Sequence, residues 1–200
     1  MLAPRPLSAN VRRHTGGKRD ERATIEPAHG RRGRTLRCSI PRVSRVPCSP
    51  NDQEGRGPVA LLGDAGIADL LQSSRRIAVV GASSKRSRPS FGVFEYLVRQ
   101  GYECVPVNPN ERDVLGVPAF RSLTEAAALT GFVDIVDVFR RPEVCAEVAR
   151  EAVAIGAGAL WLQLGVVNWE AARIAHAGGL AVVMDRCTAI EHRRLLRGPT

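Results

Sequence analysis

Short apolar runs alternate with helical patterns over most of the chain, and this alternation constrains the fold more than any other feature. The runs that are rich enough in β-branched and large apolar side chains to form strands are 77–80, 103–107, 134–139, 159–162 and 180–184. Most of them are continuously apolar, which is typical of parallel strands buried on both faces. Helical patterns lie between them, over 91–100, 122–129, 142–155 and 168–177. We therefore expect an α/β fold with a doubly wound, mainly parallel five-stranded sheet, helices on both faces, and Cys145 and Trp161 in its core.

The positive charge is concentrated near the N-terminus. The whole chain has a formal net charge of +9, but residues 1–57 hold 13 Lys and Arg against five Asp and Glu, which leaves +1 for the remainder. Residues 1–58 also lack periodicity and large apolar side chains, so we expect a disordered basic segment there and one folded domain over 59–200. Because the folded part lacks a strong basic footprint, we expect no nucleic-acid partner.

The N-terminal segment leaves the compartment open. Its first 13 residues contain Arg and no acids, as in a mitochondrial or plastid transit peptide, or they follow a start codon assigned too early. Asp20, Glu21 and Glu26 come soon afterwards and favour a cytoplasmic protein. The five cysteines form no C-x-x-C pair, which fits a reducing compartment, and no apolar run is long enough to span a bilayer.

The loop after the first predicted strand has the composition of an anion site. The strand runs directly into small and basic residues, namely Gly81, Ala82, Ser83, Ser84, Lys85 and Arg88, before a helix begins. Glycine permits a tight turn, the hydroxyls and the helix N-terminal N–H groups donate to a phosphate, and the cations add positive charge. For this segment alone, a plain connection with solvated cations remains the alternative.

The end of the second predicted strand favours CoA over NAD. NAD-binding folds commonly place an Asp or Glu there to hold the ribose diol, whereas this chain has Asn108 and Pro109. A carboxylate would repel a phosphorylated ribose, but the neutral amide of Asn108 can hydrogen-bond beside one. The G-x-G-x-x-G fingerprint is also missing. The pattern indicates CoA or another ribose-phosphate ligand.

Several ordered segments resemble the small stand-alone CoA-binding proteins, which are related to the CoA-binding domain of the succinyl-CoA synthetase alpha subunit. The matching segments are 77–83, 101–102 with 105–109, 115–116, 134–141, 161–167 and 183–187. The resemblance implies a Rossmann-like fold with CoA as the ligand. It further implies that Gly81, Ala82, Ser83 and the following basic residues lie near the phosphates, with Asn108 and Pro109 near the adenosine ribose.

Further candidates follow the third, fourth and fifth predicted strands. The resemblance places Phe139 and Arg140 beside the same crevice. A cation is unfavourable at a helix N-terminus, so an anionic partner would explain Arg140, and a solvated helix start is the alternative. Gln163 is placed by topology, and its amide could meet the pantetheine arm of CoA. Cys187 is either a packing residue or a thiol that forms a mixed disulfide with CoA, its thiolate favoured by Arg186.

The sequence contains no recognisable catalytic motif or metal-binding motif. The histidines have no partners at metal-ligand spacing, and the G-x-S-x-G nucleophile motif is absent, so we predict neither a catalytic residue nor a metal. We therefore expect a non-enzymatic protein that binds CoA or acyl-CoA as a sensor, carrier or regulatory domain. An NAD-dependent oxidoreductase using the same crevice and a CoA-binding component of an acyl-CoA ligase remain alternatives, and a homodimer is left open.

Overall fold

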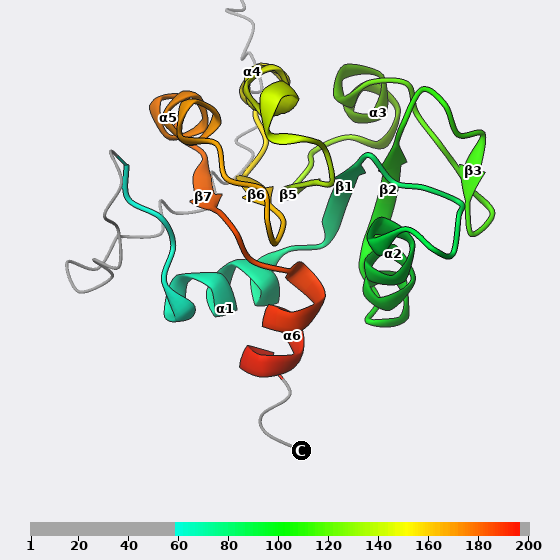
Figure 1. The fold of residues 1–200 in the computed structure, drawn as a ribbon, viewed down its shortest axis with the longest axis horizontal. Helices are drawn as coiled ribbons and strands as arrows, with labels where there is room; N and C mark the ends of the chain where they lie inside the picture. The colour runs from blue at the N-terminus through cyan, green and yellow to red at the C-terminus, as the bar shows by residue number, and fades with distance from the viewer. Residues whose placement is uncertain (1–58, 197–200) are drawn as a thin grey trace, which may run out of the picture. The chain divides into compact units, whose positions relative to one another are not determined.

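The computed structural model describes residues 59–196, which are built around one parallel sheet. Its strands are β1 (Arg76–Val80), β2 (Glu103–Val107), β5 (Ile135–Val138), β6 (Ala159–Leu162) and β7 (Ala181–Val183). They lie in the order β2-β1-β5-β6-β7, and all neighbouring strands are parallel (Figure 1). The predicted fold class, an α/β Rossmann-like and doubly wound sheet, is confirmed. The disordered basic segment predicted over 1–58 lies outside the described residues and stays a prediction.

Helices cover both faces of this sheet (Figure 1). One face carries α1 (Asp64–Ser73), α2 (Pro89–Arg99) and α6 (Thr188–Leu196), and the other carries α3 (Leu123–Thr130), α4 (Cys145–Ala154) and α5 (Trp169–Ala177). A short 3-10 helix, η1 (Pro142–Val144), leads into α4. Counted with η1, the four predicted helical segments end within two residues of the observed ones. Within 59–196, no helix is long and apolar enough to cross a membrane.

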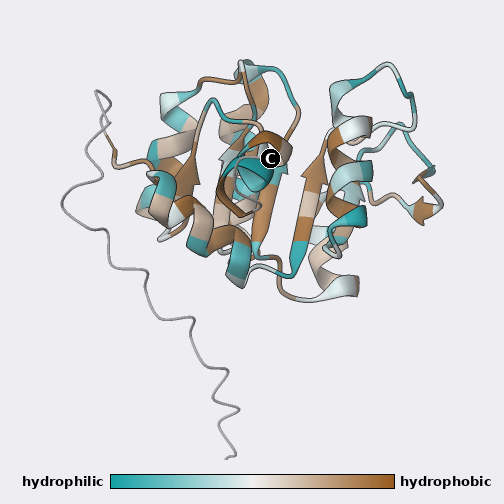
Figure 2. Cartoon of the chain, turned by 90° about the horizontal axis from the view of Figure 1, so that it is seen from below, coloured by the Kyte–Doolittle hydropathy of each residue, from teal (hydrophilic) through white to brown (hydrophobic). Residues whose placement is uncertain are grey.

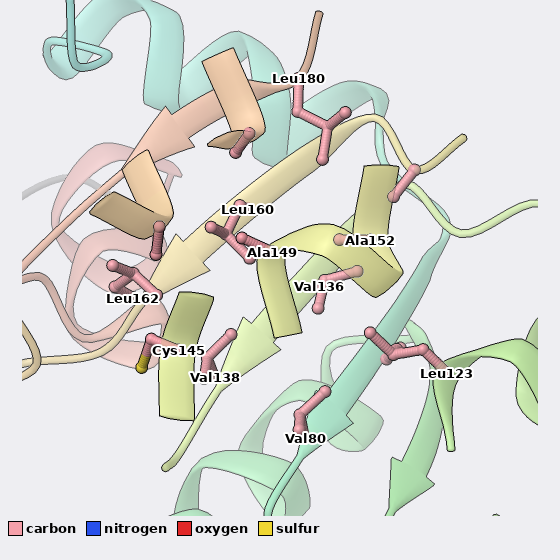
Figure 3. Packing of buried hydrophobic residues seen from close by; sticks show 14 of the residues in the cluster. Val80, Leu123, Val136, Val138, Cys145, Ala149, Ala152, Leu160, Leu162 and Leu180 are labelled. Carbon is pink, nitrogen blue, oxygen red and sulfur yellow. The ribbon is translucent and has the colours of Figure 1, made fainter. Parts of the chain in front are cut away.

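A separate hydrophobic cluster fills each side of the sheet. Val136 and Val138 point from β5 into the cluster under α3, α4 and α5, where Cys145 lies beside Val138 (Figure 3). Ile135, on the same strand, belongs to the opposite cluster with Trp161. Because successive strand side chains point to opposite faces, a strand covered on both sides is apolar almost throughout, as the hydropathy colouring shows (Figure 2). Cys145 and Trp161 are fully buried, so both core predictions are confirmed.

A small hairpin after β2 was not predicted from the sequence. It pairs β3 (Asp113–Val114) with β4 (Val117–Pro118) in antiparallel fashion. Leu115 and Gly116 form its two-residue turn with φ of 54° and 77°, as two-residue hairpins often require. The chain then returns to the end of β2, where the Phe120 N–H donates to Pro106 O over 2.9 Å. Residues 108–120 are therefore an excursion held against the carboxyl end of β2.

Candidate functional site

The order of the strands locates the candidate site between β1 and β5. β1 pairs with β2 on one side and with β5 on the other, so the chain leaves β1 toward α2 on one face and leaves β5 toward α4 on the opposite face. In doubly wound sheets, ligands bind at such a switch point, beyond the carboxyl ends of the strands. The loops that border the switch point are the β1–α2 loop, residues 81–88, and the β5–η1 segment, residues 139–141.

These two segments approach each other closely at Gly81. Its φ is +85°, a left-handed conformation that strains any residue with a Cβ. A Cβ added there would overlap the carbonyl oxygen of Phe139 and would lie only 2.9 Å from Cδ of Arg140. Glycine at this position therefore lets the backbone of β1 turn tightly against the end of β5. The structure brings together Gly81, Phe139 and Arg140, three of the residues predicted for the site.

Asn108 holds the β1–α2 loop in place. Its side-chain amide Nδ2 donates to the carbonyl oxygen of Ala82 over 2.7 Å, and its Oδ1 accepts from the Asn110 N–H at 3.1 Å. The backbone N–H of Gly81 donates to Val107 O at 2.8 Å, which adds a second tie between the loop and β2. Asn108 is thus next to the loop, and its amide positions the loop. Pro109 follows it and is exposed.

The basic part of the β1–α2 loop surrounds the start of α2. Lys85 and Arg88 are exposed, and the Arg86 guanidinium lies over the Phe91 ring, 5.4 Å from its centroid. Arg88 occupies the N-cap position of α2, where no side chain caps the helix and no acid lies in its first turn. The positive end of a helix dipole and nearby cations together attract an anion. Without an anion, these positive charges repel one another.

Glu111 joins the loop, although the sequence reasoning did not single it out. The hydroxyl of Ser83 donates to its Oε1 over 2.9 Å, and Oγ of Ser83 also accepts from the Lys85 N–H at 3.3 Å. Hydrogen bonds from Ser84 and Ser83, with a contribution from the charge of Lys85, hold the pKa of Glu111 below its usual value despite partial desolvation. The available signal was an acid three residues after Asn108, but only the turn Asn108–Glu111 aims it at the loop.

Gln163 lies at the end of β6 but is engaged in a buried polar network. It is 4% exposed, and its Nε2 donates to Oδ1 of Asp137 over 2.7 Å and contacts the hydroxyl of Thr188. That hydroxyl donates to Oδ2 of Asp137 at 2.9 Å. The side-chain amide that was expected to meet a pantetheine arm therefore uses its nitrogen to link β5, β6 and the start of α6.

Asp137 itself is fully buried in the centre of the sheet. Desolvation raises its pKa to about 7, although hydrogen bonds from Gln163 and Thr188 favour the charged form and oppose that shift. A lone acid within the apolar run Ile135–Val138 was the signal for a buried polar group. Its partners are 26 and 51 residues away in the chain, so the sequence did not identify them.

Cys187 differs from the other cysteines within residues 59–196. It is half-buried directly before α6, whereas Cys104 and Cys145 are buried. Burial raises the pKa of Cys104 to about 12 and that of Cys145 to about 11, so both are poor nucleophiles near neutral pH. The Arg186 guanidinium lies 3.1 Å from Asp64 and 3.5 Å from Glu191, so its charge is already shared with two carboxylates.

Comparison with known proteins identifies the family. Residues 75–193 match the CoA binding domain family, and this match extends from the start of β1 into α6. The chain belongs to the CoA-binding domain family. The matched segment contains the β1–α2 loop, the excursion after β2 and the network around Asp137, so every candidate group described above lies within the CoA-binding domain.

Two relatives match this chain over nearly their whole length. The chain is 43% identical over 128 residues to the uncharacterized protein YneT of Bacillus subtilis (strain 168), which covers 64% of this chain and 93% of YneT. A solved hypothetical protein from Pyrococcus horikoshii OT3 is 36% identical with a TM-score of 0.65, covering 72% of this chain and 99% of that one. A dinucleotide-forming acetyl-coenzyme A synthetase of Ca. Korarchaeum cryptofilum, in complex with phosphate and ADP, shares the fold alone, with 21% identity, a TM-score of 0.51, and coverage of 59% and 28% of the two chains.

Proposed function

We propose that this chain binds CoA or an acyl-CoA, with the diphosphate held by the β1–α2 loop. The observation that carries the proposal is the close approach of Gly81 to Phe139 and Arg140 at the strand-order switch of a CoA-binding domain. It leaves Ser83 and Ser84 beside the positive start of α2, where hydroxyls and a helix dipole favour phosphate oxygens.

The remaining candidates fit the two ends of such a ligand. Lys85 and Arg88 would pair with the phosphates, and Arg140 would add a cation from the opposite side of the switch point. Asn108 and Pro109 end β2, where the adenosine ribose lies in folds of this kind. Gln163 would lie toward the pantetheine arm, and because its amide nitrogen is committed to Asp137, it would offer that arm its carbonyl oxygen.

The proposed role is that of a non-enzymatic sensor, carrier or regulatory domain. Among the residues described, the groups gathered at the switch point are hydroxyls, amides, cations and the Glu111 carboxylate, and the hydroxyls, amides and cations would bind and orient a phosphorylated ligand. A ligase role would need a partner subunit that performs acyl transfer, and co-purification with such a subunit would support it. Native mass spectrometry of the protein purified without added ligand would show whether CoA or an acyl-CoA is retained.

A ligand comparison with an Asn108→Asp variant tests the nucleotide assignment. We expect CoA, and not NAD, to raise the melting temperature of the wild-type protein. Asn108→Asp should weaken CoA binding by roughly tenfold or more in calorimetry, because a carboxylate repels the ribose phosphate and no longer donates to Ala82 O. Asn110→Asp makes the same change two residues away and should have a smaller effect. Stabilisation by NAD alone would refute the CoA assignment.

The half-buried thiol would lie within reach of the far end of CoA. Three strand spacings separate β1 from β7, about 14 Å at the carboxyl edge, and an extended pantetheine arm spans that distance. We propose that the Cys187 thiolate attacks CoA disulfide, forming a protein–CoA mixed disulfide and releasing one CoA thiol.

The mixed disulfide is tested by intact mass and peptide mapping after incubation with CoA disulfide. We expect one CoA adduct on the peptide that contains Cys187, its loss on addition of a reductant, and its absence in Cys187→Ser. Cys104→Ser serves as the control, because that buried thiol should not react. An adduct that maps elsewhere, or that persists in Cys187→Ser at the same level, would show that the thiol has no such role.

A further inference from the structure

The β1–α2 loop already holds an anion, and that anion is a side chain of the protein. The Ser83 hydroxyl donates to Oε1 of Glu111 over 2.9 Å. Hydrogen bonds from Ser84, including one from its backbone, and the positive charge of Lys85 also act on the Glu111 carboxylate. These are the donors that the proposed function assigns to phosphate oxygens.

Two anions cannot share this set of donors without a cost. Each hydroxyl has one proton to donate, so a phosphate that takes the Ser83 proton removes the bond to Glu111. A carboxylate left within a few ångströms of a phosphate repels it, and close to a protein surface this repulsion is stronger than in bulk water. The carboxylate therefore has to turn away when a phosphorylated ligand enters the loop.

The segment that carries Glu111 allows such a movement. Glu111 is only half-buried, and it lies between the turn after β2 and the strand β3. The backbone N–H of Glu111 donates to Asn108 O over 3.2 Å, so the backbone is held at the turn while the side chain extends toward the loop. A rotation of the side chain into solvent would release the loop without disturbing the bond from Asn108 to Ala82 O.

We infer that Glu111 is an internal competitor for the phosphate site, which lowers the affinity of the β1–α2 loop for anionic ligands. This inference rests on the proposed function and adds a determinant of affinity to it. Displacing the carboxylate lowers the affinity for every anion by a similar factor, so a small anion with few contacts binds weakly, whereas a diphosphate that gains further contacts from the rest of its molecule still binds. Glu111 would thus reserve the loop for ligands larger than a free phosphate.

The test uses Glu111→Gln, which removes the charge and keeps a side chain that accepts from Ser83. We expect Glu111→Gln to bind inorganic pyrophosphate and CoA about tenfold more tightly than wild type in calorimetry, and by a similar factor for both, because the displaced group is the same. Asp113→Asn is the matched control, since it removes one charge from the same excursion at an exposed residue that bonds only to its own turn. It should change both affinities much less.

The outcomes separate the two proposals. Three results would overturn the inference about Glu111. These are unchanged or weaker pyrophosphate binding by Glu111→Gln, no pyrophosphate binding by either protein, and an equal gain in affinity in Asp113→Asn. Tighter pyrophosphate binding by Glu111→Gln combined with no CoA binding by either protein would support the inference and refute CoA as the ligand. The β1–α2 loop would then bind another phosphorylated molecule.

Discussion

A methyl group at position 81 is expected to disable the candidate site. In Gly81→Ala, the new Cβ meets the carbonyl oxygen of Phe139 and the side chain of Arg140, and the backbone has to keep a φ of +85°. The left-handed strain and the overlap together should lower the free energy of unfolding by roughly 2–4 kcal/mol. A displacement of the loop by about 1 Å should weaken CoA binding on the order of a hundredfold.

Gly92→Ala is the matched control for this substitution. Gly92 lies inside α2, and a Cβ added there meets no atom within 4 Å. Because alanine favours a helix over glycine, this variant should be more stable than wild type by roughly 0.5–1 kcal/mol and should bind CoA unchanged. Chemical denaturation and calorimetry measure both quantities. Equal effects of the two substitutions would mean that the approach of Gly81 to β5 does not matter.

The second large effect concerns the dependence of stability on pH through Asp137. Its pKa in the folded chain is raised to about 7 from the ordinary aspartate value of 3.8, so folding favours the protonated carboxyl. The resulting stability is present below pH 4 and is lost as pH rises through about 7. The difference of about three pKa units corresponds to a loss on the order of 4 kcal/mol across this range.

Asp137→Asn should remove this dependence. An asparagine cannot ionise, yet its oxygen can accept from Gln163 while its nitrogen donates to Thr188, so the buried network keeps its hydrogen bonds. We expect the variant to be more stable than wild type at pH 8 and to lose this advantage progressively as the pH falls from 7 to below 4 in urea denaturation. Glu147→Gln, on the exposed face of α4, should leave the pH profile unchanged. A constant difference between Asp137→Asn and wild type at every pH would contradict the prediction.

The sheet could be predicted because the apolar run of each strand indicates that the strand is buried. The run that became β5 is apolar at nearly every position because helices cover both of its faces, and the following helix begins with Pro142 at its first position. The hairpin around Leu115 was not predictable in the same way. Its strands are two residues long and its turn uses a leucine with positive φ, so neither periodicity nor turn composition marked it.

The candidate site was predictable in outline and not in its bonding. The small-residue loop and the end of β2 were chosen because such segments meet at the carboxyl edge of a parallel sheet, and Gly81 and Asn108 do lie at that edge. Gln163 was also placed at the correct strand end. Its engagement with Asp137 depends on the neighbouring strand, which the chain reaches 26 residues earlier. Glu111 was missed because an acid in a surface turn is usually solvated.

The sequence by itself determined the fold class, the strands and helices, and the membership of the CoA-binding domain family, because these follow from local burial patterns and ordered motifs. Only the tertiary structure decided which donors at the β1–α2 loop are already taken. The bonds from Ser83 to Glu111 and from Asn108 to Ala82 join residues 28 and 26 positions apart, and they form because β1 and β2 lie side by side. A hydrogen bond depends on distances of a few tenths of an ångström, which strand order and turn geometry set and residue composition does not.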